Sequence, residues 1–129
     1  KNLFLFVYKI SKRRDEDIST VSAIFSFKEL NGRLIDVRLV FGGMAPVPKR
    51  ASHVENVLND KVFDSSAVKL AQLAIENDFS PISDVRASSN YRMRLAKNLI
   101  HKCQLEYSTG RSITLRPNVQ RGSFADKKN

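Results

Sequence analysis

The sequence has few of the residues from which disulfides and metal sites are built. Its 129 residues include one cysteine, Cys103, and two histidines, His53 and His101. A single cysteine excludes an internal disulfide, and these three residues do not supply the four ligands of a structural metal site. We therefore expect a surface histidine at position 101 and a core cysteine at position 103. A lone thiol is also typical of a reducing compartment, so we expect a cytoplasmic protein.

Several other signatures are missing. No apolar run approaches the roughly 20 residues that a membrane-spanning helix needs, so we expect no membrane partner. The apolar stretch at residues 3–8 lacks the small-residue cleavage site of a signal peptide. There is no phosphate-binding loop, no G-x-G-x-x-G and no recognisable nucleophile motif, and the carboxylates are scattered. The chain by itself does not look like a complete enzyme, and its first residue, lysine, suggests a piece of something longer.

Positive charge is what the chain has in excess. It carries 22 Lys and Arg against 13 Asp and Glu, which gives a net charge of +9. Such a balance permits nucleic acid, phosphate ligands or an acidic partner, and it does not choose among them. The length fits one domain with a real core.

The first half of the chain shows the pattern of strands. Residues 3–9 read as a buried strand, and apolar residues alternate with polar ones over residues 21–30 and 33–41. Asn31-Gly32 between them predicts a type I′ hairpin turn. Pro46 and Pro48 make residues 46–50 an edge strand or a connection. We expect one buried face of the return strand to be formed by Ile35, Val37, Leu39 and Phe41.

The second half shows the pattern of helices, over residues 52–60, 65–77 and 89–107. We expect Ser52 to cap the first, Ser65 or Ser66 the second, and Ser88 or Ser89 the third. Gly110 is a natural stop. The expected apolar stripes are Ala67, Leu70, Ala71 and Ala74 in the second helix, and Tyr91, Leu95, Leu99, Ile100 and Cys103 in the third. Arg92, Arg94, Lys97 and Lys102 lie largely off the latter stripe.

Strands followed by helices predict an α+β domain. We expect a three- to four-stranded antiparallel sheet packed against about three helices. This domain covers residues 1–110, and residues 111–129 form a polar, partly disordered tail.

Two charged or polar stretches are candidates for a site. "YKISKRRDED" (residues 8–17) places four cations before three acids, and it reads either as a ligand-contacting edge or as a solvated turn with internal ion pairs. In "SDVRASSNYR" (residues 83–92), Asp84 and Arg86 are expected to pair, with Arg92 nearby. Gly42-Gly43 is read as a bend at a strand end rather than as a phosphate site. Nucleic-acid binding gains little support, because the aromatic residues mostly occupy apolar strand positions.

Three stretches together resemble a known family. They are "YKISKRRDEDIS" (8–19), "FGGMAPVPKRA" (41–51) and "DFSPISDVRASSNYRMRLAKNL" (78–99), in that order. The trio resembles the C-terminal domain of the FAD-binding subunit of molybdenum hydroxylases, the CO dehydrogenase flavoprotein C-terminal domain family, with bacterial xanthine dehydrogenase as the best match. The resemblance covers roughly residues 4–108, and nothing is recognised beyond Tyr107.

The resemblance implies a role and a few site residues. It implies that Lys9 contacts the flavin of FAD, and that residues 11–17, with Arg14 and Glu16 foremost, border the flavin and the nicotinamide entrance. No catalytic residue and no metal ligand is implied, and Gly42-Gly43-Met44 looks structural. The implied partners are an N-terminal FAD-binding domain and the subunits or domains that carry the molybdenum cofactor and 2Fe-2S clusters.

The function expected from the resemblance is that of an accessory domain in a xanthine dehydrogenase-like oxidoreductase. It would help to wall the flavin that passes electrons from iron–sulfur clusters to NAD, and the isolated chain would be inactive. The alternative is a basic nucleic-acid-binding or interaction module, for which the net charge is the warrant. A purely structural oligomerisation domain is a third possibility that overlaps the first.

Overall fold

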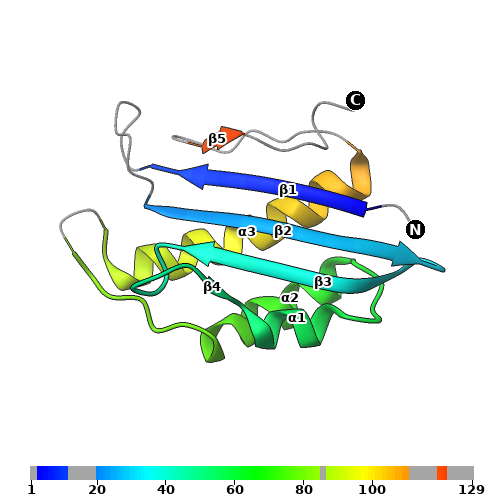
Figure 1. Cartoon of the computed structure of the whole chain (residues 1–129), viewed down its shortest axis with the longest axis horizontal. Coiled ribbons are helices and arrows are strands. Elements are labelled where there is room, and N and C mark those ends of the chain that lie inside the picture. The colour runs from blue at the N-terminus through cyan, green and yellow to red at the C-terminus, as the bar shows by residue number, and fades with distance from the viewer. Residues whose placement is uncertain (1–2, 12–19, 85–86, 111–118, 122–129) are drawn as a thin grey trace.

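The computed structural model describes residues 3–11, 20–84, 87–110 and 119–121. The strands form one antiparallel sheet in the order β4-β3-β2-β1-β5, and the helices lie on one side of it (Figure 1). The expected α+β class, an antiparallel sheet packed against three helices, is confirmed, and the short strand β5 is added to the three to four strands expected. The elements are β1 (Leu3–Ile10), β2 (Val21–Leu30), β3 (Arg33–Gly42), β4 (Lys49–Arg50), α1 (Ser52–Leu58), α2 (Ser65–Ala74), the 3-10 turn η1 (Ile75–Asn77), α3 (Ser89–Thr109) and β5 (Val119–Arg121).

The short strand β5 lies in the segment for which the sequence predicts only a polar tail. Its three residues pair with Tyr8, Lys9 and Ile10 of β1. Three residues are too few to show a strand period, so the pairing depends on the edge that β1 offers. The rest of the predicted tail lies outside the described residues.

The hairpin between β2 and β3 is confirmed, with one correction. Asn31 and Gly32 both have positive φ, 54° and 79°, as a type I′ turn requires. Further along, Asp36 and Val37 of β3 together oppose the single residue Phe27 of β2, which is a β-bulge.

The bulge moves one residue of the predicted core face. Asp36 has φ 55°, and the extra residue reverses the alternation at the start of β3. Leu34 is therefore fully buried, and Ile35, which was expected there, is only partly buried. A strict period of two cannot reveal such an insertion.

Aromatic rings form the centre of the core between the sheet and the helices. The ring of Phe27 lies 5.3–5.7 Å, centre to centre, from those of Phe4, Phe25, Phe63 and Tyr107. Most of these contacts are edge-to-face, the geometry that aromatic pairs favour. The expectation that the strand aromatics belong to the core is confirmed.

The helix α1 begins without the expected cap. Ser52 is its first helical residue, and Ala51 precedes it without a capping side chain. The carboxylate of Asp78, far along the chain, accepts hydrogen bonds from the backbone N–H groups of His53 and Val54, at 2.9 and 3.1 Å. A cap supplied by another element leaves no local sequence signal, which is why the prediction for Ser52 is wrong.

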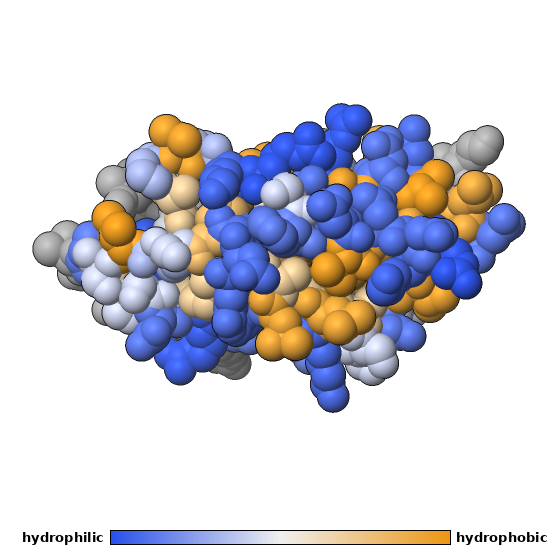
Figure 2. All heavy atoms as spheres, turned by 90° about the horizontal axis from the view of Figure 1, so that it is seen from below, coloured by the Kyte–Doolittle hydropathy of each residue, from blue (hydrophilic) through white to orange (hydrophobic). Residues whose placement is uncertain are grey.

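The helix α2 differs from the prediction at both its cap and its buried stripe. Asp64, rather than Ser65 or Ser66, caps it by accepting a hydrogen bond from the N–H of Ala67 at 2.9 Å. Val68 is buried in place of Leu70, which is 46% exposed. Leu73 of the same helix is exposed as well. Figure 2 shows several apolar patches among polar residues on the side of the domain that is seen from below.

The helix α3 has the predicted ends. The side chain of Ser88 accepts a hydrogen bond from the N–H of Tyr91, and Gly110 closes the helix with φ 68°. Leu99, Ile100 and Cys103 are buried as expected, and Tyr91 and Leu95 are partly buried. The prediction for Arg92 and Lys102 is wrong, since both are buried, with 3% and 1% of their surface exposed. None of the helices among the described residues is both long and apolar enough to cross a membrane.

A buried ionic cluster lies between β1 and α3. The hydroxyl of Tyr8 donates to Glu106 Oε1 at 2.6 Å, and Lys102 Nζ donates to Glu106 Oε2 at 2.5 Å. The Lys102 ammonium also lies 5.4 Å from the centre of the Tyr8 ring. Each charge is therefore compensated inside the core, which is the condition for burying it.

We expect the free energy of unfolding to fall in alkaline solution. Burial raises the pKa of Cys103 and of Tyr8 well above their usual ranges, and also that of Tyr107, which donates to Glu29. In the unfolded chain these groups ionise near pH 8.5 for cysteine and about pH 10 for tyrosine. The folded state then holds protons that the unfolded state has lost, so stability declines as the pH rises through this range.

Urea unfolding at pH 7, 9 and 10.5 measures this decline. Each ionising group adds a slope of up to about 1.4 kcal/mol per pH unit above its unfolded pKa. The Cys103→Ala variant is the control, since it should lack the part of the decline that begins near pH 8.5. A constant free energy of unfolding up to pH 10.5 would contradict the prediction.

Candidate functional site

Lys9 lies near the end of β1, on the face of the sheet that the helices leave open. Its neighbours Tyr8 and Ile10 are buried against the helices, so alternation turns Lys9 to the opposite side, where it is exposed. Its backbone lies between Ser22 of β2 and Gln120 of β5. Within the part of the chain that the structure describes, its ammonium makes no hydrogen bond or ion pair.

The segment that follows β1 is closed by a hydrogen bond at its base. The N–H of Thr20 donates to the carbonyl oxygen of Ile10 at 2.7 Å, which brings the two ends of residues 11–19 together. Arg14 and Glu16 belong to this segment, but they lie outside the described residues. Their predicted contact with the flavin therefore stays a prediction.

Arg92 of α3 reaches this end of the sheet, beside Ile10 and Thr20, from the helical side. One guanidinium nitrogen donates to the carbonyl oxygens of Gly43, at 2.8 Å, and Thr20, at 3.5 Å. The other donates to Asp84 Oδ1 at 2.6 Å. Thr20, Gly43 and Asp84 lie in or directly beside the three quoted stretches, which are far apart in the sequence. One buried side chain thus fixes all three at a single end of the sheet.

The arrangement adds one ion pair and supports one interpretation. Asp84 pairs with Arg92, which the sequence placed nearby, and the predicted pair of Asp84 with Arg86 stays a prediction because Arg86 lies outside the described residues. Gly43 has φ 84°, and a Cβ atom there would lie 2.2 Å from the carbonyl oxygen of Thr20. Gly42-Gly43 therefore serves a close backbone approach, as the structural interpretation expects.

The helical spacing of the sequence does indicate a buried residue at position 92, but arginine is not a residue type that is expected in a core. Positions 92, 96, 99 and 103 have the 4-3-4 spacing of a buried helical stripe, and all four are buried. A guanidinium on that stripe needs acceptors, which only the tertiary structure supplies. The surface position of His101 and the core position of Cys103 are confirmed. Among the described residues, no group of His, Cys, Asp and Glu side chains could hold a metal ion.

The comparison with known families decides the classification. The CO dehydrogenase flavoprotein C-terminal domain family matches residues 6–107 of the chain. The chain belongs to this family. The family predicted from the three stretches is therefore confirmed for this flavoprotein C-terminal domain.

Curated relatives and solved structures agree with this classification. The domain is 28% identical over 95 residues to the xanthine dehydrogenase FAD-binding subunit of Escherichia coli, and 32% identical over 96 residues to the glyceraldehyde dehydrogenase medium chain of Sulfolobus acidocaldarius. These matches cover 74% of the chain and 32% and 34% of the relatives, so the chain spans about a third of their length. Quinoline 2-oxidoreductase from Pseudomonas putida superimposes with a TM-score of 0.69 at 25% identity, over 82% of this chain and 38% of the other.

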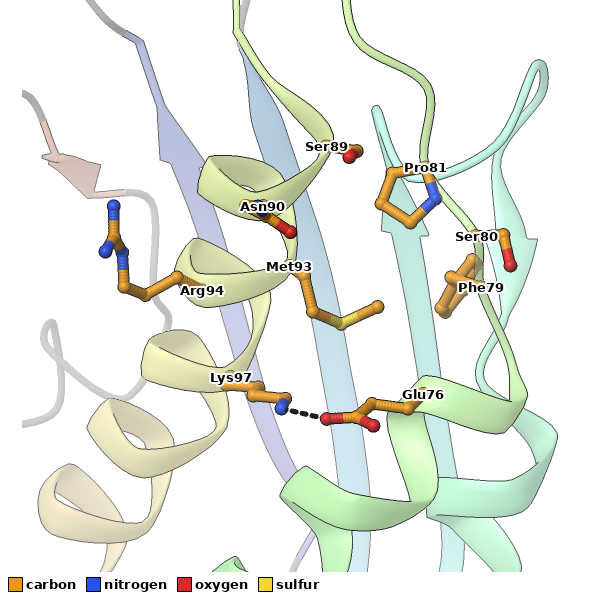
Figure 3. A pocket seen from close by; sticks show the side chains of 9 residues that line it. All are labelled: Glu76, Phe79, Ser80, Pro81, Ser89, Asn90, Met93, Arg94 and Lys97. Carbon is orange, nitrogen blue, oxygen red and sulfur yellow. Dashed lines mark hydrogen bonds and ion pairs between the residues drawn. The ribbon is translucent and has the colours of Figure 1, made fainter.

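A hollow on the helical side of this flavoprotein domain is separate from Lys9. It has a volume of about 660 Å³ and lies between the start of α3, η1 and residues 79–81 (Figure 3). Phe79, Pro81 and Met93 form its apolar lining, and an ion pair between Lys97 and Glu76 spans it. None of the residues predicted to contact the flavin lines it, so we assign it no ligand.

The requirement for glycine at position 43 can be measured. The Gly43→Ala variant is expected to lose about 2–3 kcal/mol in the free energy of unfolding. The methyl group would be strained on a left-handed backbone, and it would also clash with the carbonyl oxygen of Thr20. Gly32→Ala is the matched control, with φ 79° and nothing within 4 Å of the added methyl group. Equal losses in chemical denaturation of the two variants would show that the approach to Thr20 is unimportant.

Proposed function

We propose that this chain is the C-terminal domain of the FAD-binding subunit of a xanthine dehydrogenase-like molybdenum hydroxylase. In the whole cytoplasmic enzyme, electrons from a substrate oxidised at a molybdenum cofactor pass through 2Fe-2S clusters to FAD and then to NAD. The domain walls the flavin and carries no bond-making residue of its own. Its partners are the N-terminal FAD-binding domain and the iron–sulfur and molybdenum domains or subunits.

The observation that carries the proposal is the position of Lys9. Its ammonium stands on the open face, one residue before the strand end where the three stretches that carry the family resemblance meet. FAD accepts two electrons and becomes more negative, so a cation at the carbonyl edge of the ring would stabilise the reduced form. Arg14 and Glu16, on the segment after β1, are proposed to border the flavin and the approach of NAD.

The Lys9→Ala variant of the full-length FAD-binding subunit tests this role. We expect the reduction potential of the flavin to fall by about 30 mV, which corresponds to about 1.4 kcal/mol for a two-electron couple. The fall has this direction because removing a cation destabilises the reduced, more negative flavin. The potential is read from flavin absorbance during titration with a reference dye.

Lys28→Ala is the matched control. Lys28 is on the same open face of the sheet, but it pairs with Leu3 at the other end of β1. Lys9 is six residues along β1 from Leu3, the partner of Lys28, so roughly 20 Å of strand separates the two lysine positions. The control should keep the potential of the wild type. If Lys9→Ala also keeps the wild-type potential and flavin content, then Lys9 does not face the flavin.

A further inference from the structure

The strand β1 is apolar on both of its faces, while the helices cover only one. An antiparallel sheet with a solvated face normally shows polar residues at alternate positions. In β1 the positions that face the helices hold Phe4, Phe6, Tyr8 and Ile10, and those on the open face hold Leu3, Leu5, Val7 and Lys9. Such a continuous apolar run is typical of a strand that is buried on both sides. In Figure 1 the helices lie behind and below the sheet, so nothing drawn as a helix covers the near face.

The apolar character of the open face continues across the neighbouring strands. Val7 of β1 lies opposite Ile24 of β2, and Ile24 lies opposite Val40 of β3. We call Val7, Ile24 and Val40 the open-face row. Ile24 is 49% exposed, and the other two are partly buried. Direct neighbours on one face have Cβ atoms about 5 Å apart, so the three branched side chains form one continuous apolar ridge.

The edge of the sheet on the β3 side is already occupied, so a partner of the open face does not pair with that edge. Residues 59–61 and β4 cover β3 along its length, through hydrogen bonds such as Leu34 N–H to the carbonyl of Lys61 and Ala51 N–H to that of Leu39. Glu55 accepts a hydrogen bond from the N–H of Leu39 at 2.8 Å and is held by Arg50. A covered edge does not add further strands.

We propose that the open-face row is the surface on which the flavin-holding part of the same subunit docks, an inference that rests on the proposed function. About two thirds of the length of the bacterial and archaeal relatives lies outside the matched region, so a large neighbour belongs to the same polypeptide. Lys9 stands on the same face, two residues along β1 from Val7. A neighbour that brings the flavin to Lys9 must approach from this side.

The other exposed apolar surface cannot serve this partner at the same time. Leu70 and Leu73 are 46% and 65% exposed, but they belong to α2, which packs on the side of the sheet opposite Lys9. The charges around the open-face row specify the partner further. Lys9 is an exposed cation on this face, whereas Arg38 already pairs with Asp36 at 3.6 Å. The docking surface of the partner is therefore apolar at its centre and acidic where it meets Lys9.

Thiol labelling of two matched variants tests the proposal. Ile24→Cys and Leu73→Cys are made separately in the full-length FAD-binding subunit, and the native Cys103 is fully buried, which keeps the background low. The labelling rate of each new thiol is divided by its rate in the denatured subunit. We expect Ile24→Cys to react at least about tenfold more slowly than Leu73→Cys, because a docked surface is reached only through local opening.

The possible outcomes separate this inference from the proposed function. Flavin content and the effect of Lys9→Ala are measured on the same preparations. Rapid labelling of Ile24→Cys, in a subunit that holds flavin and responds to Lys9→Ala, overturns the docking surface alone. A subunit without flavin overturns the proposed function. Protection of Ile24→Cys that disappears on dilution, together with a fall from dimer to monomer mass, means that a second copy covers the face and also overturns the proposal.

Discussion

Replacing Glu106 by glutamine is expected to lower the free energy of unfolding by about 3–5 kcal/mol at pH 7. Glutamine keeps the size of the side chain and can still accept the hydrogen bond from Tyr8. It removes the negative charge that compensates the ammonium of Lys102, and only 1% of the surface of Lys102 is exposed to water. The cost is that of losing this charge compensation in the core, and equilibrium unfolding in urea measures it.

The double variant Lys102→Met/Glu106→Gln is the control for this explanation. It removes both charges and keeps an apolar stem at position 102, so it should recover most of the stability that Glu106→Gln loses. If the double variant is as unstable as the single one, the loss comes from packing around Glu106 and the electrostatic explanation is wrong. With the single variant Lys102→Met added, the cycle also gives the coupling free energy between the two side chains.

Replacing Arg92 by methionine is expected to cost a similar amount, about 3–5 kcal/mol in the free energy of unfolding. The variant keeps an apolar stem but leaves the carbonyl oxygens of Thr20 and Gly43 without the guanidinium that donates to them. It also removes a charged partner of Asp84. Because these contacts fix the strand end beside Lys9, we expect the full-length subunit to retain less flavin as well.

Two further variants make this prediction specific. Arg92→Lys keeps the charge but cannot present two nitrogens in a planar fork, so it should recover only part of the stability. Arg94→Met changes an exposed arginine on the same helix and should stay within about 0.5 kcal/mol of the wild type. Denaturant unfolding compares the variants. A loss for Arg92→Met no larger than that for Arg94→Met would mean that the buried contacts contribute little.

The pattern of the sequence was sufficient for the regular elements. Alternation located β2 and β3, and Asn31-Gly32 located the turn between them, because a hairpin depends on neighbours in the chain. Helical spacing located α1, α2 and α3 to within a few residues. The three quoted stretches were sufficient for the family, since their order along the chain is itself the signal.

The tertiary structure decided everything that depends on residues far apart in the chain. The cap of α1 comes from Asp78, and the bulge at Asp36 moves Ile35 out of the core. The same holds for polar groups in the core. A cation is expected at the surface unless its partner is known, and the partners of Arg92 and Lys102 were brought to them only by folding.

The sequence by itself determined the strands β1, β2 and β3, the helices, the hairpin and the family, because each of these depends on local spacing or on the order of motifs. It also placed Lys9 in a strand, but it did not fix which face of the sheet the helices would leave open. That was decided by the packing of α1, α2 and α3 against one side only. Burial of the large aromatic residues on that side left Lys9 and the open-face row on the other, where the flavin-holding part of the subunit is proposed to lie.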